Sequence, residues 1–362
     1  MINIRGLIAA SLAATLAEAC GGGGAPTTTN GFLADMSGPG AERVASLSST
    51  SRNLYVANAG ANTVTVYQSG GSERLRTISQ DVSNPYTFAL AASGDLFVAN
   101  DASGRKDCKP QCSVTQYARG SDKLVGSIPQ SEKRPHALGF DAGGNLYVAG
   151  CNESCRPDGV VEVYGRRGKT LLRSISAGVN NPRAMAYDGA ANLYVANAGS
   201  NSVTVYAPGS TSLLETISDG ISYPSALAFD NAGNLYVANE VGSTVTVYAP
   251  YSTKVLRTVT DGVSYPDALT FDASQNLYVA NSVRLHEKGN DVTVYTPGSS
   301  EVSYTVSQGV ASPVALVIDG GGDLYVANYT NSTVTAYAPG KNSPKMTISQ
   351  GVRNPRALLF GP

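Results

Sequence analysis

Seven prolines recur along the chain in similar local sequences, but the residue that follows them changes in chemical type. These residues are, in chain order, Tyr86, His136, Arg183, Ser225, Asp267, Val314 and Arg356. Guanidinium and carboxylate groups make strong charge-assisted hydrogen bonds, so such side chains, if gathered in one place, would bind a small anionic or polar ligand. Our candidate ligand-binding residues are therefore Tyr86, His136, Arg183, Asp267 and Arg356.

The alternative is that the residue type at these positions varies without a function, because arginine is the only type that occurs twice among them. The asparagines that end neighbouring strands, such as Asn58 and Asn239, would then only cap turns. A Ca²⁺ ion held by asparagine carbonyls and Asp267 is the one cofactor that these residues suggest. We otherwise expect no cofactor and assign no metal ligand or catalytic residue.

Four of the five cysteines form two closely spaced pairs, Cys108 with Cys112 and Cys151 with Cys155. In an exported protein such an even set predicts two local disulfides. A zinc site shared by all four thiolates is the alternative. Redox catalysis fits less well, because the C-x-x-x-C spacing differs from that of thioredoxin-type motifs.

A third polar segment, residues 282–290, contains His286 and Glu287 between Arg284 and Lys288. Imidazole and carboxylate groups can bind ligands or exchange protons, so His286 and Glu287 are further candidate ligand-binding residues. The alternative is a solvated charged loop.

Composition excludes several functions. Charged residues make up 15% of the chain and the net charge is −1, which disfavours nucleic-acid binding. The sequence has no G-x-S-x-G, H-E-x-x-H or phosphate-loop motif. A metal-dependent enzyme needs clustered carboxylates or histidines, and the chain has only 2 histidines. The sequence therefore favours a binding module over an enzyme.

An internal repeat dominates the chain. The motif Leu-Tyr-Val-Ala-Asn, with two variants, begins at Leu54, Leu96, Leu146, Leu193, Leu235, Leu277 and Leu324. Each copy is followed by a strand that ends in tyrosine, a further strand, and a proline-containing link into the next unit, as at residues 235–272. Gly, Asn, Asp and Pro separate these segments, so each unit should contain four short strands.

The Leu-Tyr-Val-Ala segment is apolar on both faces, and a sheet of this kind must be covered on both sides. A closed ring of sheets provides that cover. We therefore predict an all-β, seven-bladed β-propeller of four-stranded antiparallel blades; six or eight blades and a β-helix are less compatible with the repeat. The segment Ala357–Phe360 is an eighth copy of the first-strand motif. It should close the ring in the first blade, with Arg43–Ser48 displaced.

All insertions fall in one connection of the repeat. Successive motif leucines are most often 42 residues apart, and the excesses of 8, 5 and 5 residues all lie between the second and third strands. These connections should emerge at the same end of the ring as the proline links. We expect this loop face to contact an unidentified protein, peptide or glycan, since binding residues favour loops on a rigid frame.

The unit Pro-x-Ala-Leu-x-Phe-Asp-x-x-Gly-Asn-Leu-Tyr-Val-Ala-Asn resembles the NHL repeat, and more loosely YVTN-type propeller repeats, over residues 43–360. The resemblance implies a propeller and leaves the activity open. Some exported propellers are metal-dependent lactonases or lyases with a site at the central funnel, so such an enzyme is the alternative to a binding or scaffold module. No His/Glu pair of virginiamycin-lyase-like propellers is found in this chain. A purely structural spacer is a third possibility.

The N-terminus predicts export. Residues 7–17 are an apolar or small-residue run too short to span a bilayer, and Ala17-Glu18-Ala19 is an A-x-A cleavage pattern. Together with Cys20 this resembles a bacterial lipoprotein signal. We expect a signal peptide (1–19), a flexible Gly/Thr-rich tether (20–40) and the propeller (41–362). The protein should be a monomer in the bacterial cell envelope, held by a lipid on Cys20; ordinary secretion or a soluble periplasmic protein is the alternative.

Overall fold

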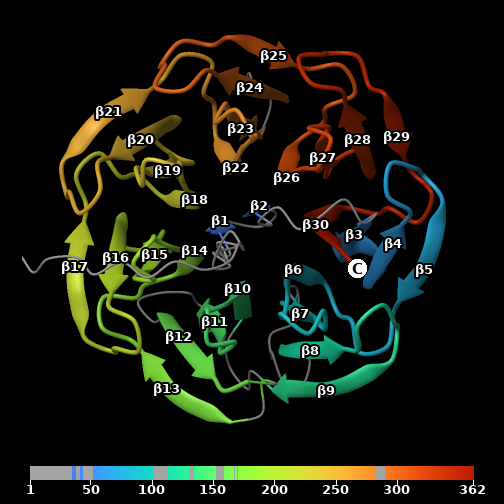
Figure 1. Cartoon of the computed structure of the whole chain (residues 1–362), viewed down its shortest axis with the longest axis horizontal. Coiled ribbons are helices and arrows are strands. Elements are labelled where there is room, and N and C mark those ends of the chain that lie inside the picture. Colours follow the sequence, from blue (N-terminus) through green and yellow to red (C-terminus); the bar gives the residue numbers. More distant parts are fainter. Residues whose placement is uncertain are drawn as a thin grey trace, which may run out of the picture. The chain divides into compact units, whose positions relative to one another are not determined.

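The first strand of each repeat lies at the centre of a ring and the fourth strand lies at its outside (Figure 1). The computed structural model describes residues 52–101, 112–129, 134–151, 159–166, 168, 170–282 and 290–362, together with the backbone of 35–37 and 41–43. Within these ranges, seven sheets of four antiparallel strands form a ring. The predicted all-β propeller of seven blades is confirmed, which excludes six or eight blades.

The strands of blades 1 to 7 are given from the inside of the ring outwards. The innermost are β30 (Pro355–Gly361), β6 (Pro85–Leu90), β10 (Arg134–Phe140), β14 (Pro182–Tyr187), β18 (Pro224–Phe229), β22 (Pro266–Phe271) and β26 (Pro313–Ile318). The second are β3 (Asn53–Asn58), β7 (Leu96–Asn100), β11 (Leu146–Cys151), β15 (Leu193–Asn197), β19 (Leu235–Asn239), β23 (Leu277–Asn281) and β27 (Leu324–Asn328).

The third strands are β4 (Thr63–Tyr67), β8 (Ser113–Tyr117), β12 (Gly159–Tyr164), β16 (Ser202–Tyr206), β20 (Thr244–Tyr248), β24 (Asp291–Tyr295) and β28 (Thr333–Tyr337). The outermost are β5 (Arg74–Ile78), β9 (Leu124–Pro129), β13 (Leu171–Ile175), β17 (Leu213–Ile217), β21 (Val255–Val259), β25 (Tyr304–Val306) and β29 (Met346–Ile348). A 3₁₀ turn, η1 (Ala59–Ala61), follows β3, and β1 (Asp35–Ser37) and β2 (Ala41–Arg43) precede it.

The C-terminal strand closes the ring, as predicted. Strand β30 pairs antiparallel with β3, with Phe360 opposite Leu54 and Leu358 opposite Val56. Strand β2 pairs with β1 rather than with blade 1, and the backbone of these two strands contacts innermost strands around the channel. Blade 1 is therefore built from both ends of the propeller sequence. Because β3 and β30 pair with each other, the facing edges of these two strands are not left open.

The hydrophobic core consists of layers between blades. Seven buried clusters are found among the described residues, and each combines side chains of two neighbouring blades, including the pair formed by blades 7 and 1. In blade 5, Tyr236 and Ala238 face one neighbour while Leu235 and Val237 face the other. Apolar residues on both faces of the second strand are thus buried by the ring itself.

Tyrosines that end the third strands join each blade to the link that enters it. In six blades the phenol hydroxyl donates a hydrogen bond to a link carbonyl, in the pairs Tyr67–Gln350, Tyr117–Gln80, Tyr206–Ala177, Tyr248–Asp219, Tyr295–Asp261 and Tyr337–Gln308. Burial raises the pKa of Tyr117 and Tyr295 to about 12, so these hydroxyls remain protonated donors. Edge-to-face contacts such as Tyr236–Phe271, with ring centroids 5.0 Å apart, add to the contact between blades.

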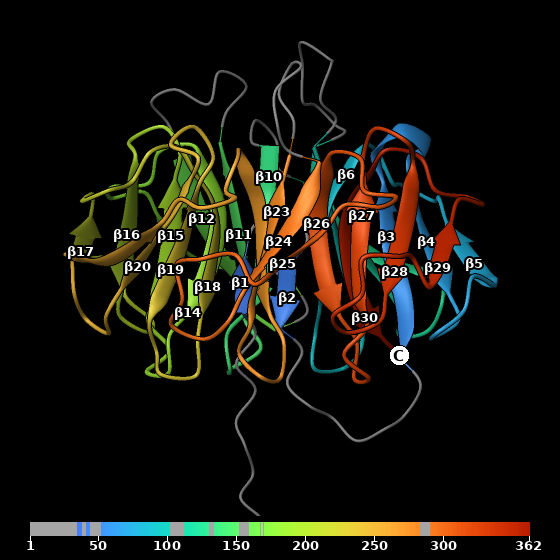
Figure 2. The ribbon, with the colours of Figure 1, turned by 90° about the horizontal axis from the view of Figure 1, so that it is seen from above.

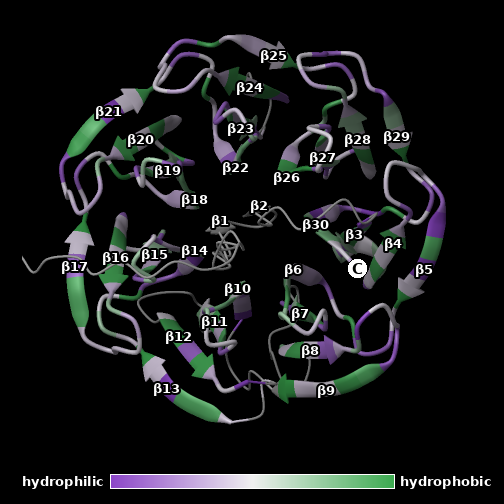
Figure 3. Cartoon of the chain, in the orientation of Figure 1, coloured by the Kyte–Doolittle hydropathy of each residue, from purple (hydrophilic) through white to green (hydrophobic). Residues whose placement is uncertain are grey.

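The outer strands combine a buried end with an exposed apolar beginning, which is visible as green segments around the rim in Figure 3. The side chains of Leu75, Val125, Leu172, Leu214 and Leu256 are 44 to 62% exposed. In four of these strands the last residue packs into the core; these residues are Ile78, Ile175, Ile217 and Val259. Some apolar side chains of the outer strands therefore do not pack into the core between blades.

Replacing Tyr248 by phenylalanine removes the hydroxyl that reaches the Asp219 carbonyl. We expect the free energy of unfolding to fall by about 1 kcal/mol, since one buried donor is lost and the surface link can still reach water. Tyr251→Phe is the control, because Tyr251 is 71% exposed. Urea denaturation measures both variants, and equal stability of Y248F and the wild type would contradict this role.

Candidate functional site

The seven residues that follow the link prolines gather at one end of the channel. The strands run along the axis of the ring, so all innermost strands begin at the same end (Figure 2). In each blade the pairing of first and second strands shifts register at this residue, between Pro182 and Ala184 in blade 4 and between Pro266 and Ala268 in blade 6, for example. Such a β-bulge frees one residue from the ladder and redirects its side chain.

The links themselves are held by the buried asparagines that end the second strands. The Oδ1 atom of Asn239 accepts the N–H of Ser222, two residues before a link proline, and its Nδ2 group donates to Thr246. Equivalent bonds are made by Asn58, Asn100, Asn197, Asn281 and Asn328. These asparagines are fully buried, and their amide groups cap the links.

Two further positions of the repeat reach the same end of the channel, and sequence reasoning missed both. One is the residue before the link proline, whose φ lies between 44 and 54° in six blades; these residues are Asn84, Asn181, Tyr223, Tyr265, Ser312 and Asn354. The other is the residue after the second strand, whose N–H donates to the carbonyl of the first, as Glu240 does to Tyr223 and Ser282 to Tyr265. Variation beside a fixed asparagine or proline is the signal that could have identified them.

These three positions enclose a cavity of about 140 Å³. From the predicted ring it takes Tyr86, Arg183, Asp267, Val314 and Arg356, and from the two other positions Glu240, Tyr265, Ser282 and Tyr329. The structure thus brings together four of the candidate residues, Tyr86, Arg183, Asp267 and Arg356. Ser225 points elsewhere, because its hydroxyl donates to the Pro266 carbonyl at 2.6 Å.

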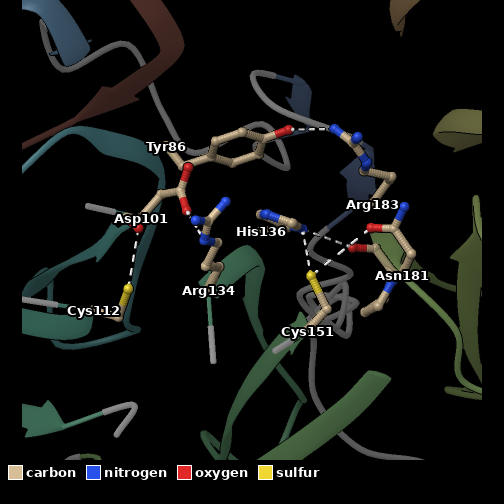
Figure 4. Close-up of polar contacts among 9 residues, drawn as sticks. Tyr86, Asp101, Cys112, Arg134, His136, Cys151, Asn181 and Arg183 are labelled. Carbon is tan, nitrogen blue, oxygen red and sulfur yellow. Dashed lines mark hydrogen bonds and ion pairs between the residues drawn. The ribbon is translucent and has the colours of Figure 1, made fainter. Parts of the chain in front are cut away.

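Arg183 is positioned by two tyrosines. Its Nη1 lies 3.2 Å from the Tyr86 hydroxyl (Figure 4). Its Nη2 lies 2.8 Å from the Tyr223 hydroxyl. The attraction of Tyr86, followed by that of Tyr223 and Glu240, raises the pKa of Arg183 despite its burial. Its Nε atom is buried and has no hydrogen-bond partner among the described residues. The guanidinium is therefore a fixed, fully charged group.

Arg356 is positioned by aromatic faces. Its guanidinium carbon lies 5.2 Å from the ring centre of Tyr86 and 5.3 Å from that of Tyr329. Within the described ranges its Nε also lacks a hydrogen-bond partner. Contacts of this kind favour a cation without neutralising it. The two arginines, from blades 4 and 1, thus approach Tyr86 from different sides.

His136 lies beside the cavity rather than in its wall. Its ring centroid is 5.0 Å from that of Tyr86, and its Nδ1 is 3.3 Å from the Pro182 carbonyl oxygen and 3.8 Å from the Cys151 sulfur (Figure 4). Burial, and secondarily the charge of Arg183, lowers the pKa of His136 to about 3. The imidazole is consequently neutral at physiological pH and contributes no charge to the site.

Blade 3 departs from the repeat at this end. Gly150 replaces the capping asparagine, and a Cβ atom there would lie 2.5 Å from the Arg134 carbonyl oxygen. Strand β10 therefore begins one residue before its proline, with Arg134 paired to Cys151. The Nε atom of Arg134 lies 3.8 Å from the Asp101 carboxylate of blade 2.

Several candidate residues lie outside the described residues or at the ends of the described strands. Cys20, Cys108, Cys155, His286 and Glu287 lie outside the described residues. Cys112 and Cys151 are buried at strand ends, and the two predicted disulfides remain predictions. The insertions begin after Asp101, Cys151 and Ser282. These three residues occupy the repeat position at which Glu240, Ser282 and Tyr329 border the cavity. The variable connections therefore start at the cavity end of the ring.

The chemistry of the cavity is that of polar recognition. In the described part of the chain, no group of three or more His, Cys, Asp or Glu side chains is arranged to hold a metal ion. The two guanidinium groups can donate charge-assisted hydrogen bonds, and Asp267 and Glu240 can accept them. The geometry thus suits binding of a small molecule with polar groups.

No protein-family model matches the chain, and no curated protein matches it either. Solved structures do match. A protein of Bacteroides fragilis, provisionally named a 6-phosphogluconolactonase, shares 17% identity over 88% of this chain and 100% of its own, with a TM-score of 0.70. A protein of the same provisional name from Bacteroides uniformis shares 13% identity over 86% and 99% of the chains, with a TM-score of 0.66.

A protein from Lactobacillus plantarum shares 16% identity over 86% of this chain and 99% of its own, with a TM-score of 0.65. At such identities the similarity establishes the fold alone. The chain is a seven-bladed β-propeller, and its assignment to the NHL repeat remains an interpretation of the motif.

The buried neutral state of His136 predicts a pH dependence of stability. The unfolded chain has a histidine of ordinary pKa, about 6.5, whereas the folded chain takes up this proton only near pH 3. Between these values the unfolded state binds more protons, so stability falls as the pH drops. This histidine should lower the free energy of unfolding by about 2 kcal/mol between pH 7 and pH 5.

We expect His136→Gln to lack this component, so that its free energy of unfolding changes less between pH 7 and pH 5 than that of the wild type. Urea denaturation at several pH values measures the difference. His286→Gln, which removes the only other histidine, is the comparison. An identical pH dependence of H136Q and the wild type would show that His136 does not remain neutral on folding.

Proposed function

We propose that the protein is a binding propeller that holds a small polar molecule with an anionic group at the mouth of its channel. The observation that carries this proposal is the pair of preorganised arginines, Arg183 and Arg356, on the wall of one cavity. Both guanidinium groups are held by tyrosines, which orient them while leaving their charge available. An anion would thus meet donors that need no further ordering.

The same end of the ring is the proposed contact face for a larger partner. The insertions of blades 2, 3 and 6 start beside the cavity, at Asp101, Cys151 and Ser282. We propose that a protein, peptide or glycan contacts this end of the ring. The proposed scaffold role therefore involves the same face as the small-molecule site. We propose that the two predicted local disulfides stiffen the loops of that face.

Catalysis is the second candidate function, and the names of two structural neighbours favour testing it. Both are provisionally named 6-phosphogluconolactonases, and the match spans nearly all of each chain. Hydrolysis of 6-phosphogluconolactone by this protein, measured with and without added Ca²⁺, would support a lactonase. Absence of turnover under both conditions, with binding retained, would support the binding module.

We also propose that the protein is exported and lipid-anchored. The proposal rests on residues 1–20 of the sequence. Within the described residues, no helix has the length and apolar character needed to span a bilayer. A lipid on Cys20 is our proposed means of attachment to the membrane.

Replacement of Cys20 by serine should abolish incorporation of labelled palmitate in a bacterial host and move the protein from the membrane to the soluble fraction. The reason is that the thiol is the acceptor of the lipid in the proposed signal. Labelling and fractionation measure both effects. A wild-type protein that is exported without label would favour ordinary secretion.

The ligand site is tested by calorimetry with a panel of hydroxy acids, sugar acids, sugar phosphates and amino acids. For the compounds that bind, Arg183→Gln and Arg356→Gln should each weaken binding about tenfold or more, because a charge-assisted hydrogen bond is lost. Arg119→Gln is the matched control, since Arg119 is exposed in the turn after β8. Unchanged affinity in both cavity variants would reject the cavity as the site.

A further inference from the structure

The cations and the carboxylates of the cavity lie on different arcs of its wall, which meet where Glu240 of blade 5 attracts Arg183 of blade 4. Arg356, Tyr86 and Arg183 come from blades 1, 2 and 4, whereas the carboxylates Glu240 and Asp267 come from the consecutive blades 5 and 6. One arc of the wall therefore donates hydrogen bonds from cations, and the other arc accepts them at anions. This asymmetry is imposed on a nearly sevenfold frame entirely by side-chain identity.

The charges of the wall also balance. Two guanidinium groups face two carboxylates, and the neighbouring Arg134 lies beside its own carboxylate, Asp101. His136 is neutral and adds nothing to this sum. A simple anion would be attracted by the arginines and repelled by Asp267 and Glu240. A molecule with one positive and one negative group would be attracted by both arcs.

The size of the cavity limits the ligand further. Its volume is about 140 Å³. Sites for drug-sized ligands are larger, at about 300–1,000 Å³. The cavity thus fits a molecule of a few heavy atoms, and an oligosaccharide or peptide could insert only one end.

Building on the proposed function, we propose that the ligand is a small zwitterion, namely a free α-amino acid. Its carboxylate lies on the side of Arg183 and Arg356, and its ammonium group lies on the side of Asp267 and Glu240. The guanidinium groups of both arginines border the cavity and supply charge-assisted donors for the carboxylate. Tyr265 and Tyr329 line the remaining wall, where a short side chain would be accommodated.

The proposal is tested by calorimetry of the full mature chain with the twenty L-amino acids. The amino acid that binds most tightly is then compared with its hydroxy-acid analogue, as L-alanine with L-lactate, which replaces the ammonium group by a hydroxyl. We expect the hydroxy acid to bind at least tenfold more weakly. Equal or tighter binding of the hydroxy acid would overturn the zwitterion while leaving the anion site intact.

Variants assign the two ends of the ligand. Asp267→Asn should weaken amino-acid binding at least tenfold and leave hydroxy-acid binding unchanged or stronger, whereas Arg356→Gln should weaken both. Glu301→Gln, an exposed carboxylate in the loop after β24, is the control. Unchanged amino-acid affinity in D267N would overturn the proposal.

The outcomes also separate this proposal from the one on which it rests. If no amino acid binds but a sugar acid or sugar phosphate does, and Arg183→Gln removes that binding, the zwitterion is rejected and the anion site stands. If no compound of either kind binds, both proposals are rejected. Denaturation midpoints of all variants verify that losses of affinity occur in folded protein.

Discussion

A sheet that is apolar on both faces is stable only between two others, and the ring depends on this constraint. Every second strand carries Leu-Tyr-Val-Ala or a close variant, and each buried cluster spans two blades. No blade can therefore be complete by itself, and an open row of blades would expose one apolar face at each end. The pairing of β30 with β3 completes blade 1, whose packing against blade 7 covers both of those faces.

The binding face follows from how the ring is joined. Each link must run from the rim of one blade to the centre of the next, and it is held by a tyrosine hydroxyl outside and an asparagine amide inside. A residue of positive φ, a proline and a bulge then turn the chain into the channel. The conformation of the link thus places three repeat positions at the same end of the ring. These are the residues before and after the link proline and the residue after the second strand.

The fold was predictable because the repeat shows its period, its turns and its two-faced strands directly in the residues. The positions after the prolines were predictable for the same reason, which correctly placed Tyr86, Arg183, Asp267 and Arg356 on one wall. Glu240 and Tyr329 were missed, because only the hydrogen-bonded link shows that the residue after the asparagine also reaches the channel. The neutral state of His136 depends on burial and on Arg183, neither of which the sequence reveals.

The bulges at the channel mouth have an evolutionary consequence. Each bulged residue is outside the ladder, and the paired residues on either side of it, such as Pro266 and Ala268, keep the backbone fixed. Substitutions at Asp267 or Val314 would therefore alter the wall of the cavity without altering how neighbouring blades fit together. A single scaffold of this type can diversify its specificity one blade at a time, in the way that antibodies diversify loops on a constant framework.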